Sequence, residues 1–180
     1  MKIKVFFALL FIGVILLPSF ASDIFQKKVS AKYVSDNIYA FESAKCTFSQ
    51  NKFMKKSEVS LISGGDFEFI KDKGVIFKTT YPIRSDAYYT SDSNKNAASI
   101  IKSVANKNYT YLDKNFDLFY LSENNESWIL ALKPKKGTKI EDDLISIQIF
   151  GKNLQNTGSI SKMVIDTKNI KNEIKFDGCR

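Results

Sequence analysis

The sequence has 180 residues, with 27 lysines and arginines, 19 acidic residues, two cysteines and no histidine. Without histidine, Ser-His-Asp and Cys-His catalytic arrangements are excluded, and two distant cysteines cannot form a usual zinc site. The formal net charge is +8, and it is +6 without the first 21 residues, which contribute Lys2 and Lys4 and no acidic residue. This positive charge favours contact with anionic lipid head groups or with an acidic partner.

Residues 1–21 have the three parts of a secretory signal peptide: a basic start, MKIK, the apolar run VFFALLFIGVILL, and small residues at a cleavage site, Ser19 and Ala21. The run is shorter than the roughly 20 residues that span a bilayer, and a retained membrane anchor is the alternative. Ser22 stands where a lipid-anchored lipoprotein would have cysteine. We therefore predict one soluble domain over residues 22–180, exported to the periplasm, where nucleic acid is not an expected partner.

The first element predicted after the signal peptide is a helix over Asp23–Phe41. Apolar residues recur there at helical spacing, at Ala31, Val34, Ile38 and Phe41. Ser22 or Asp23 can accept a hydrogen bond from the first turn and so cap the helix. We therefore expect one N-terminal helix before the sheet begins.

Extended segments follow this helix. In AKCTFSQNKF, alternate residues share one face, namely Ala44, Cys46, Phe48 and Gln50. The segment EVSLIS leads to Gly64-Gly65, which permits a turn or a bulge. Phe67–Ile70 and Val75–Thr80 then alternate on either side of KDKG, which predicts a hairpin that ends at Pro82. A further strand is expected near Asp86–Thr90.

A short helix is predicted within SNKNAASIIKSVANKN. Its apolar residues form a single stripe at helical spacing, at Ala97, Ile100, Ile101, Val104 and Ala105. Asp92 or Ser93 can cap its start. An amphipathic helix of this length can cover a sheet as a lid.

The alternating pattern returns after the second helix. Phe116–Tyr120 and Trp128–Leu132 are predicted to form a hairpin with a polar turn at Glu123–Glu126. DLISIQIF, GSISKMVIDT and NEIKFDG add further strands, which brings the expected number to about nine. The predicted fold class is α+β: an incompletely closed antiparallel β-barrel, or strongly curved sheet, with helices across its opening.

The two cysteines, Cys46 and Cys179, lie near opposite ends of the predicted domain. In an oxidising compartment this pair predicts one disulfide, which would close almost the whole domain into a loop. One buried thiol and one thiol at a frayed terminus is the alternative.

Other polar motifs give little support for enzyme activity. Glu141–Asp143 lacks the alternating ligands and glycine of a calcium loop and is expected to be a solvated turn. Asp66 and Glu68 could serve as acid and base in a glycosidase only if they converged. The basic segment Lys133–Lys139 is either a soluble loop or a docking surface for lipid phosphates or an acidic partner. We expect no enzyme activity, metal or cofactor.

The predicted domain is rich in aromatic residues. Eleven of the 15 phenylalanines, the tryptophan and all eight tyrosines lie after residue 21. Some strands carry apolar residues on both faces, since Phe53 lies opposite the Phe48 face and Phe119 opposite the Phe116 face. Two interpretations stay open: a sheet curled around a hydrophobic cavity, and an ordinary well-filled core.

Several segments, taken in order, resemble the outer-membrane lipoprotein carrier proteins of the LolA family. FESAKCTFSQNK (Phe41–Lys52) resembles the opening strand of that family. SGGDFEF followed by GVIFKTTYP is similar to its second signature, and WILALKPK, ISIQIF and a final IKF continue the likeness. The resemblance covers nearly all of residues 22–180 and is closest to the LolA-like branch.

This resemblance implies an unclosed antiparallel barrel with a helical lid over a hydrophobic cavity. Family members are periplasmic chaperones that take acylated lipoproteins from an inner-membrane lipoprotein-releasing transporter and pass them to an outer-membrane acceptor. The LolA-like branch also carries other lipids or amphipathic products that feed export systems. The expected function is thus that of a monomeric lipoprotein or lipid carrier. A secreted hydrolase or structural protein with a filled core is the hypothesis from a different class.

The resemblance also implies a set of ligand-binding residues. Phe67 and Phe69 match the family's apolar pair, and Phe77 falls where many members have tryptophan. The expected wall is Phe48, Phe67, Phe69, Phe77, Trp128 and Leu130, and the expected lid is Ile100, Ile101 and Val104. Many members have an arginine-proline pair before the hairpin glycine that helps latch the lid. Here Lys73 precedes Gly74, and a lysine cannot reproduce the guanidinium fork.

Overall fold

The structure is a computed structural model that describes residues 24–89, 97–123 and 126–180. The signal peptide predicted over residues 1–21 lies outside the described residues, as do Asp92 and Ser93, the predicted caps of the second helix. Among the helices in the described ranges, none is long and apolar enough to cross a membrane.

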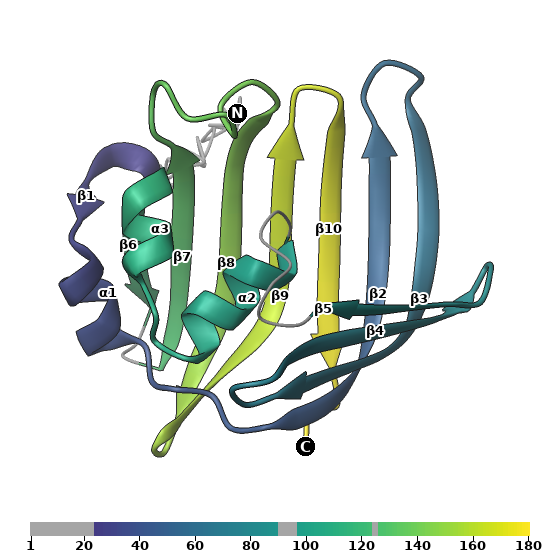
Figure 1. The fold of residues 1–180 in the computed structure, drawn as a ribbon. Helices are drawn as coiled ribbons and strands as arrows, with labels where there is room; N and C mark the ends of the chain where they lie inside the picture. The colour runs from purple at the N-terminus through teal and green to yellow at the C-terminus, as the bar shows by residue number, and fades with distance from the viewer. Residues whose placement is uncertain (1–23, 90–96, 124–125) are drawn as a thin grey trace, which may run out of the picture.

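Ten strands form one antiparallel sheet in the order β1-β6-β7-β8-β9-β10-β2-β3-β4-β5 (Figure 1). Their bounds are β1 Lys28–Val29, β2 Ala44–Met54, β3 Val59–Ile70, β4 Gly74–Tyr81, β5 Ser85–Tyr89, β6 Phe116–Glu123, β7 Ser127–Pro134, β8 Leu144–Leu154, β9 Thr157–Thr167 and β10 Ile170–Asp177. The edge strands β1 and β5 do not pair with each other, so the sheet is open. The predicted α+β class with an incompletely closed antiparallel sheet is confirmed.

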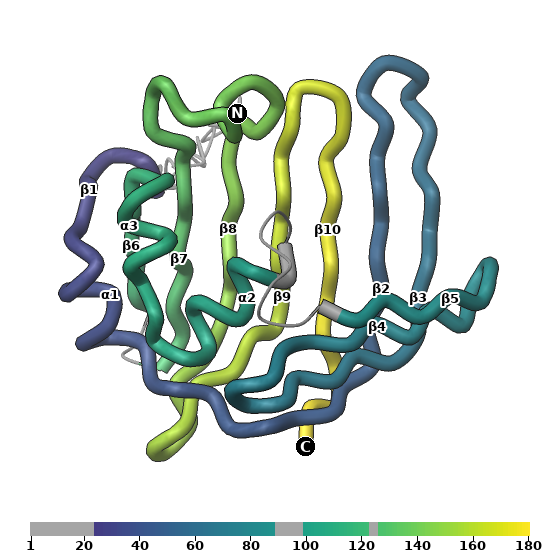
Figure 2. The backbone as a smooth tube through the Cα atoms, viewed as in Figure 1, coloured from purple at the N-terminus to yellow at the C-terminus, as the bar shows by residue number. Residues whose placement is uncertain are grey.

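The three α-helices lie over the concave face of this sheet, and the 3-10 helix packs against β6 on the convex face. The helices are η1 Ile24–Gln26 (3-10), α1 Ala31–Asn37, α2 Ala97–Ala105 and α3 Thr110–Asn115. Figure 2 shows α3 in front of β6 and β7 and α2 in front of β8 and β9, with β4 and β5 curling round toward the same side. The helix predicted over Ala97–Ala105 is thus confirmed, and it covers the opening of the curved sheet.

The single helix predicted over Asp23–Phe41 is wrong in its extent. The α-helix begins only after Ser30, whose hydroxyl accepts a hydrogen bond from the Tyr33 N–H at 3.1 Å. Before it, Lys28 and Val29 pair with Phe119 and Leu118 of β6 as the short strand β1. The helix ends at Asn37 because Ile38 is extended. The described residues therefore form ten strands, where about nine were expected.

EVSLIS and the strand after it form one continuous strand, β3, with an irregularity at Gly64-Gly65 in its pairing with β4. Gly65 is needed there, because a Cβ atom at this position would lie 2.0 Å from the Lys78 carbonyl oxygen. The expected bulge is confirmed, and the expected hairpin around KDKG becomes β3–β4. The hairpin of Phe116–Tyr120 and Trp128–Leu132 is confirmed as β6–β7.

Strand register gathers the apolar side chains on the concave face. Leu130, Ile149, Met163 and Ile174 lie side by side on β7, β8, β9 and β10, and all four are buried. On the convex face, Phe119 is covered by the Phe25 ring at a centroid distance of 5.3 Å, with the Lys133 ammonium 4.1 Å from the centre of that ring. The main core therefore lies between the concave face and the helices.

Tyr109, just before α3, provides a test of the core. Tyr109 is 5 % exposed, and its hydroxyl has no hydrogen-bond partner among the described residues. Burial raises the pKa of this hydroxyl, and the nearby Tyr120 adds to the shift. The Tyr109→Phe change removes an unsatisfied polar atom, so we expect the free energy of unfolding near neutral pH to rise by about 1 kcal/mol.

The same change should also reduce the loss of stability at alkaline pH. The folded-state pKa of Tyr109 lies above the unfolded value of about 10, so ionisation of the phenol is less favourable in the folded protein than in the unfolded chain. The wild type therefore loses stability as the pH rises above about 10. Urea unfolding as a function of pH should show a smaller alkaline loss in Tyr109→Phe. The exposed Tyr39 provides the control Tyr39→Phe, with no change expected. A destabilised Tyr109→Phe protein would contradict the prediction.

Candidate functional site

An apolar pocket lies on the concave face between α2 and the sheet. Its wall is formed mainly by Phe41, Phe67, Phe69, Ile101, Ile160 and Phe176, together with Cys46 and Cys179. The pocket volume is about 50 Å³. This is well below the roughly 300–1,000 Å³ of typical ligand pockets, so a long ligand requires part of the wall to move.

Alternation along β3 brings the first part of the wall to the concave face. Phe67 and Phe69 are two residues apart, and they lie opposite Cys46 and Ala44 of β2. Ile101 of α2 closes the pocket from the helix side and is buried. The pocket is therefore bounded by the sheet below and by a single short helix above.

Phe41 connects the approach to β2 with the end of α2. Its backbone N–H donates a hydrogen bond to the Ala105 carbonyl at 2.9 Å. Its ring lies 6.4 Å from those of both Phe69 and Trp128. The C-terminal end of α2 is thus attached to the rest of the molecule by a backbone hydrogen bond.

Four phenylalanine rings form a cluster beside the pocket. The ring centroids of Phe67 and Phe77 are 4.9 Å apart, those of Phe48 and Phe77 5.2 Å, and those of Phe67 and Phe176 4.7 Å. Phe48, Phe67 and Phe176 are buried, whereas Phe77 is half-buried. Phe77 is therefore the member of the cluster that solvent reaches most readily.

The buried side of α2 is its apolar stripe. Ile100, Ile101, Val104 and Ala105 belong to the core cluster, with Val104 and Ala105 fully buried. The Ser103 hydroxyl donates back to the Ser99 carbonyl within the helix at 2.8 Å. Apolar contact is thus the main physical link between this stripe and the sheet.

The structure brings the sequence-predicted residues together in part. Phe67, Phe69 and Ile101 line the pocket. Phe48, Ile100, Val104, Trp128 and Leu130 are buried in the same core cluster, and Phe77 packs against it. Trp128 is held by a hydrogen bond from its indole N–H to the Asn153 Oδ1 at 3.2 Å, and it lies over Gly151. Ligand binding by these nine residues stays a prediction.

Sequence reasoning missed Phe41 and Phe176 as pocket residues. Phe176 follows Ile174 at the strand period in β10, so its position on the concave face was available from the sequence. Phe41 was placed in the N-terminal helix instead of the extended segment before β2. Its helical spacing from Val34 and Ile38 gave a misleading signal.

The predicted disulfide between Cys46 and Cys179 is confirmed, with an S–S distance of 2.02 Å. The bridge also lines the pocket. Next to it, Lys45 and Arg180 exchange two backbone hydrogen bonds of 2.9 and 3.1 Å. The chain after β10 is thereby fixed against β2 at the edge of the site.

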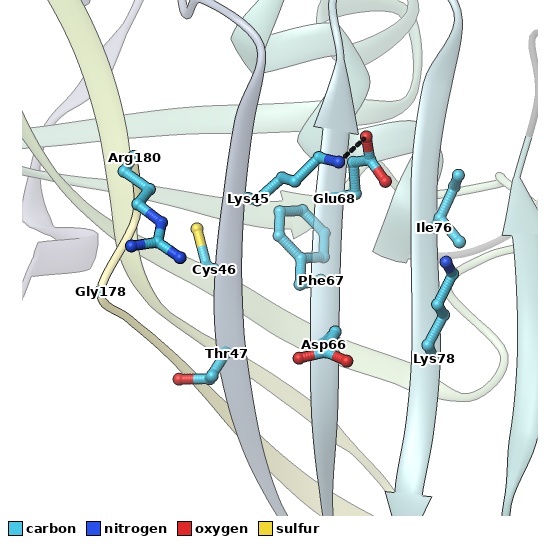
Figure 3. A pocket seen from close by; sticks show the side chains of 10 residues that line it. All are labelled: Lys45, Cys46, Thr47, Asp66, Phe67, Glu68, Ile76, Lys78, Gly178 and Arg180. Atoms are coloured by element: carbon cyan, nitrogen blue, oxygen red, sulfur yellow. Dashed lines mark ion pairs between the residues drawn. The ribbon is translucent and has the colours of Figure 1, made fainter.

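The convex side of the same strands carries a different, charged hollow of about 340 Å³ (Figure 3). Lys45 lies 3.4 Å from Glu68 there, and Asp66 lies opposite Lys78 in the strand register. Each carboxylate thus faces a lysine across the sheet. Within the described part of the chain, no group of three or more cysteine, aspartate or glutamate side chains could hold a metal ion.

No protein-family model matches the sequence, and no curated protein matches it significantly. The structure is similar to a LolA superfamily protein from Nitrosomonas europaea, with 7 % identity and a TM-score of 0.40 over 84 % of this chain and 93 % of that chain. It is also similar to a domain from Vibrio parahaemolyticus named for outer membrane lipoprotein sorting, with 9 % identity and a TM-score of 0.41 over 83 % and 89 %.

A DUF1329 family protein from Desulfovibrio piger is similar at 10 % identity, with a TM-score of 0.36 over 83 % of this chain and 90 % of that chain. At these identities and TM-scores, the similarities carry no information about ligand or function.

Proposed function

We propose that the protein is a periplasmic carrier that binds the acyl chains of lipoproteins, or of a related lipid, between α2 and the concave face of the sheet. The observation that supports this most directly is the apolar pocket under α2, which is continuous with a phenylalanine cluster whose outer member, Phe77, is half-buried. An acyl chain could enter beside the partly exposed Phe77 and bind in the apolar pocket.

Binding requires α2 to move away from the sheet. The pocket of about 50 Å³ accepts only a short part of an acyl chain while Ile101 closes it. Because the α2 stripe is apolar, an acyl chain can replace its contacts with the sheet without leaving buried polar groups unpaired. Each buried CH₂ group contributes about 0.8 kcal/mol, which offsets the loss of the helix contacts.

The same exchange allows release. When the cargo leaves, Ile100, Ile101 and Val104 return to the sheet, so the empty protein does not expose a large apolar surface. Lys73 is exposed in the β3–β4 turn. We propose that apolar packing of α2 takes the place of the arginine latch. Such a carrier would receive cargo from an inner-membrane transporter and deliver it to an outer-membrane acceptor.

Native mass spectrometry of the protein purified from its own periplasm tests the proposal. We expect a population whose added mass equals that of an acylated lipoprotein. A free lipid in its place would keep the carrier proposal and change the cargo. Protein that carries no adduct, and that takes up no fluorescent fatty acid after delipidation, would overturn the proposal in favour of a filled core.

A further inference from the structure

Five of the twelve residues of β3 form a sheet edge that no other described strand covers. β4 pairs with β3 only from Gly64 to Ile70, so Val59–Ser63 is paired on one side by β2 and, among the described residues, by no strand on the other. Figure 1 shows the upper half of β3 standing free beside β2, above the point where β4 and β5 cross. A row of backbone N–H and C=O groups therefore faces outward.

This edge lacks the features that usually prevent strand addition. Natural edges are commonly short, charged, or interrupted by proline. β1 has two residues, one of them Lys28, and β5 carries Asp86 in its sequence SDAYY. The free part of β3 reads VSLIS, which contains no charge and no proline and includes the β-branched Val59 and Ile62. It is thus the edge best suited to accept another strand.

Large apolar side chains lie exposed on both faces of this edge. Leu61 is 52 % exposed on the concave side, and Ile62 is 60 % exposed on the convex side. At the end of the free edge, where β4 leaves, Tyr81 and Ile83 are 61 % and 76 % exposed. An added strand with alternating apolar side chains could cover residues on both faces.

The charge around the edge favours an acidic partner. Lys52 lies opposite Leu61 in the register with β2, Lys56 is exposed in the β2–β3 turn, and Arg84 is exposed beyond Ile83. The β2–β3 turn also carries the acidic residue Glu58. A second copy of this chain would bring its own Lys52 and Lys56 against these cations, which disfavours self-pairing. A lipid bilayer would leave the outward N–H and C=O groups without partners.

We propose that Val59–Ser63 is a docking edge for an extended, acidic segment of a partner protein, which adds to the sheet beside β3 as a further strand. This interaction does not depend on the lipid site, because the edge lies outside the pocket under α2. Backbone hydrogen bonds supply the attachment, and Leu61, Ile62 and the nearby cations select the partner.

Selection from a display library of short random peptides tests the proposal. Binders should be enriched in acidic residues alternating with apolar ones, and a synthetic copy should slow amide hydrogen exchange at Val59–Ser63. The Leu61→Lys change should weaken that peptide at least tenfold. Leu154→Lys, at a residue 50 % exposed on the interior strand β8, is the matched control and should bind normally. Alternate backbone N–H groups of an added strand face β3. N-methylation of those amides should weaken binding, and N-methylation of the amides that face away should leave it unchanged.

Three results would overturn the proposal. One is a selection that yields no binders, or binders that protect amides elsewhere. Another is a dimer in sedimentation that Leu61→Lys dissociates, which would assign the edge to a second copy. The third is binding to phosphatidylglycerol vesicles that Leu61→Lys abolishes, with no peptide bound. Fatty-acid uptake should be the same in Leu61→Lys and the wild type, so failure of the carrier proposal and failure of this one are distinguishable.

Discussion

The Phe77→Glu protein should lose at least tenfold in affinity for a fluorescent fatty acid while keeping the circular dichroism of the wild type. Phe77 is half-buried and contacts Phe48, Phe67 and Phe176 across the concave side of the sheet. A carboxylate at this position can still reach water, so the sheet should form. It would, however, place a charge beside the path of the acyl chain, and burying an unpaired charge is strongly unfavourable.

Phe53→Glu is the matched control for this prediction. Phe53 is also a half-buried phenylalanine on a strand, but it lies on the opposite face of β2 from Phe48. The Phe53→Glu protein should bind the fatty acid as the wild type does. If Phe77→Glu unfolds the protein, Phe77 is a core residue and its assignment to the binding site is wrong. If Phe77→Glu stays folded and binds normally, the ligand does not pass Phe77.

Removal of the Cys46–Cys179 bridge should lower the free energy of unfolding by about 3–5 kcal/mol. The two cysteines are 133 residues apart in the sequence, so the bridge closes nearly the whole of the described chain into one loop. In the chain-entropy model, a loop of this length restricts the unfolded state by about 5 kcal/mol, and native strain reduces that figure. The urea midpoint of the Cys46→Ala/Cys179→Ala protein should fall accordingly.

Reduction provides an independent check on the disulfide prediction. Dithiothreitol should lower the midpoint of the wild type by a similar amount and leave that of the double variant unchanged. Because both cysteines line the pocket, the double variant should also bind fatty acid differently from the wild type. Equal midpoints for the oxidised and the reduced wild type would contradict the prediction.

Most of the sheet could be predicted from the sequence because its strands are long and alternate regularly. Two short elements, β1 and α3, were not predicted. β1 has two residues, which is too few to show any period, and it exists because Lys28 and Val29 reach the edge of β6. α3 has six residues, although the buried Tyr109, Leu112 and Phe116 give a helical spacing that could have indicated it.

The site was predictable to a similar degree. Alternation placed Phe67 and Phe69 on one face, and the helical stripe placed Ile101 opposite them, and all three line the pocket. The sequence could not show that Phe48, Phe77 and Phe176 would pack together, since β2, β4 and β10 meet only through tertiary pairing. Nor could it show how small the pocket is, because side-chain volumes fill space only once the sheet is curved.

The order of the strands determines when the molecule can be completed during its synthesis. β2 lies between β3, which follows it directly in the chain, and β10, which comes after all the other described strands in the sequence. Until β10 emerges, β2 and β9 remain two open edges in the middle of the future sheet, and Phe176 and Cys179 are missing from its interior. Such pairing between distant segments forms slowly. The nascent chain therefore stays incompletely folded until β10 has been made and has paired with both of its neighbours.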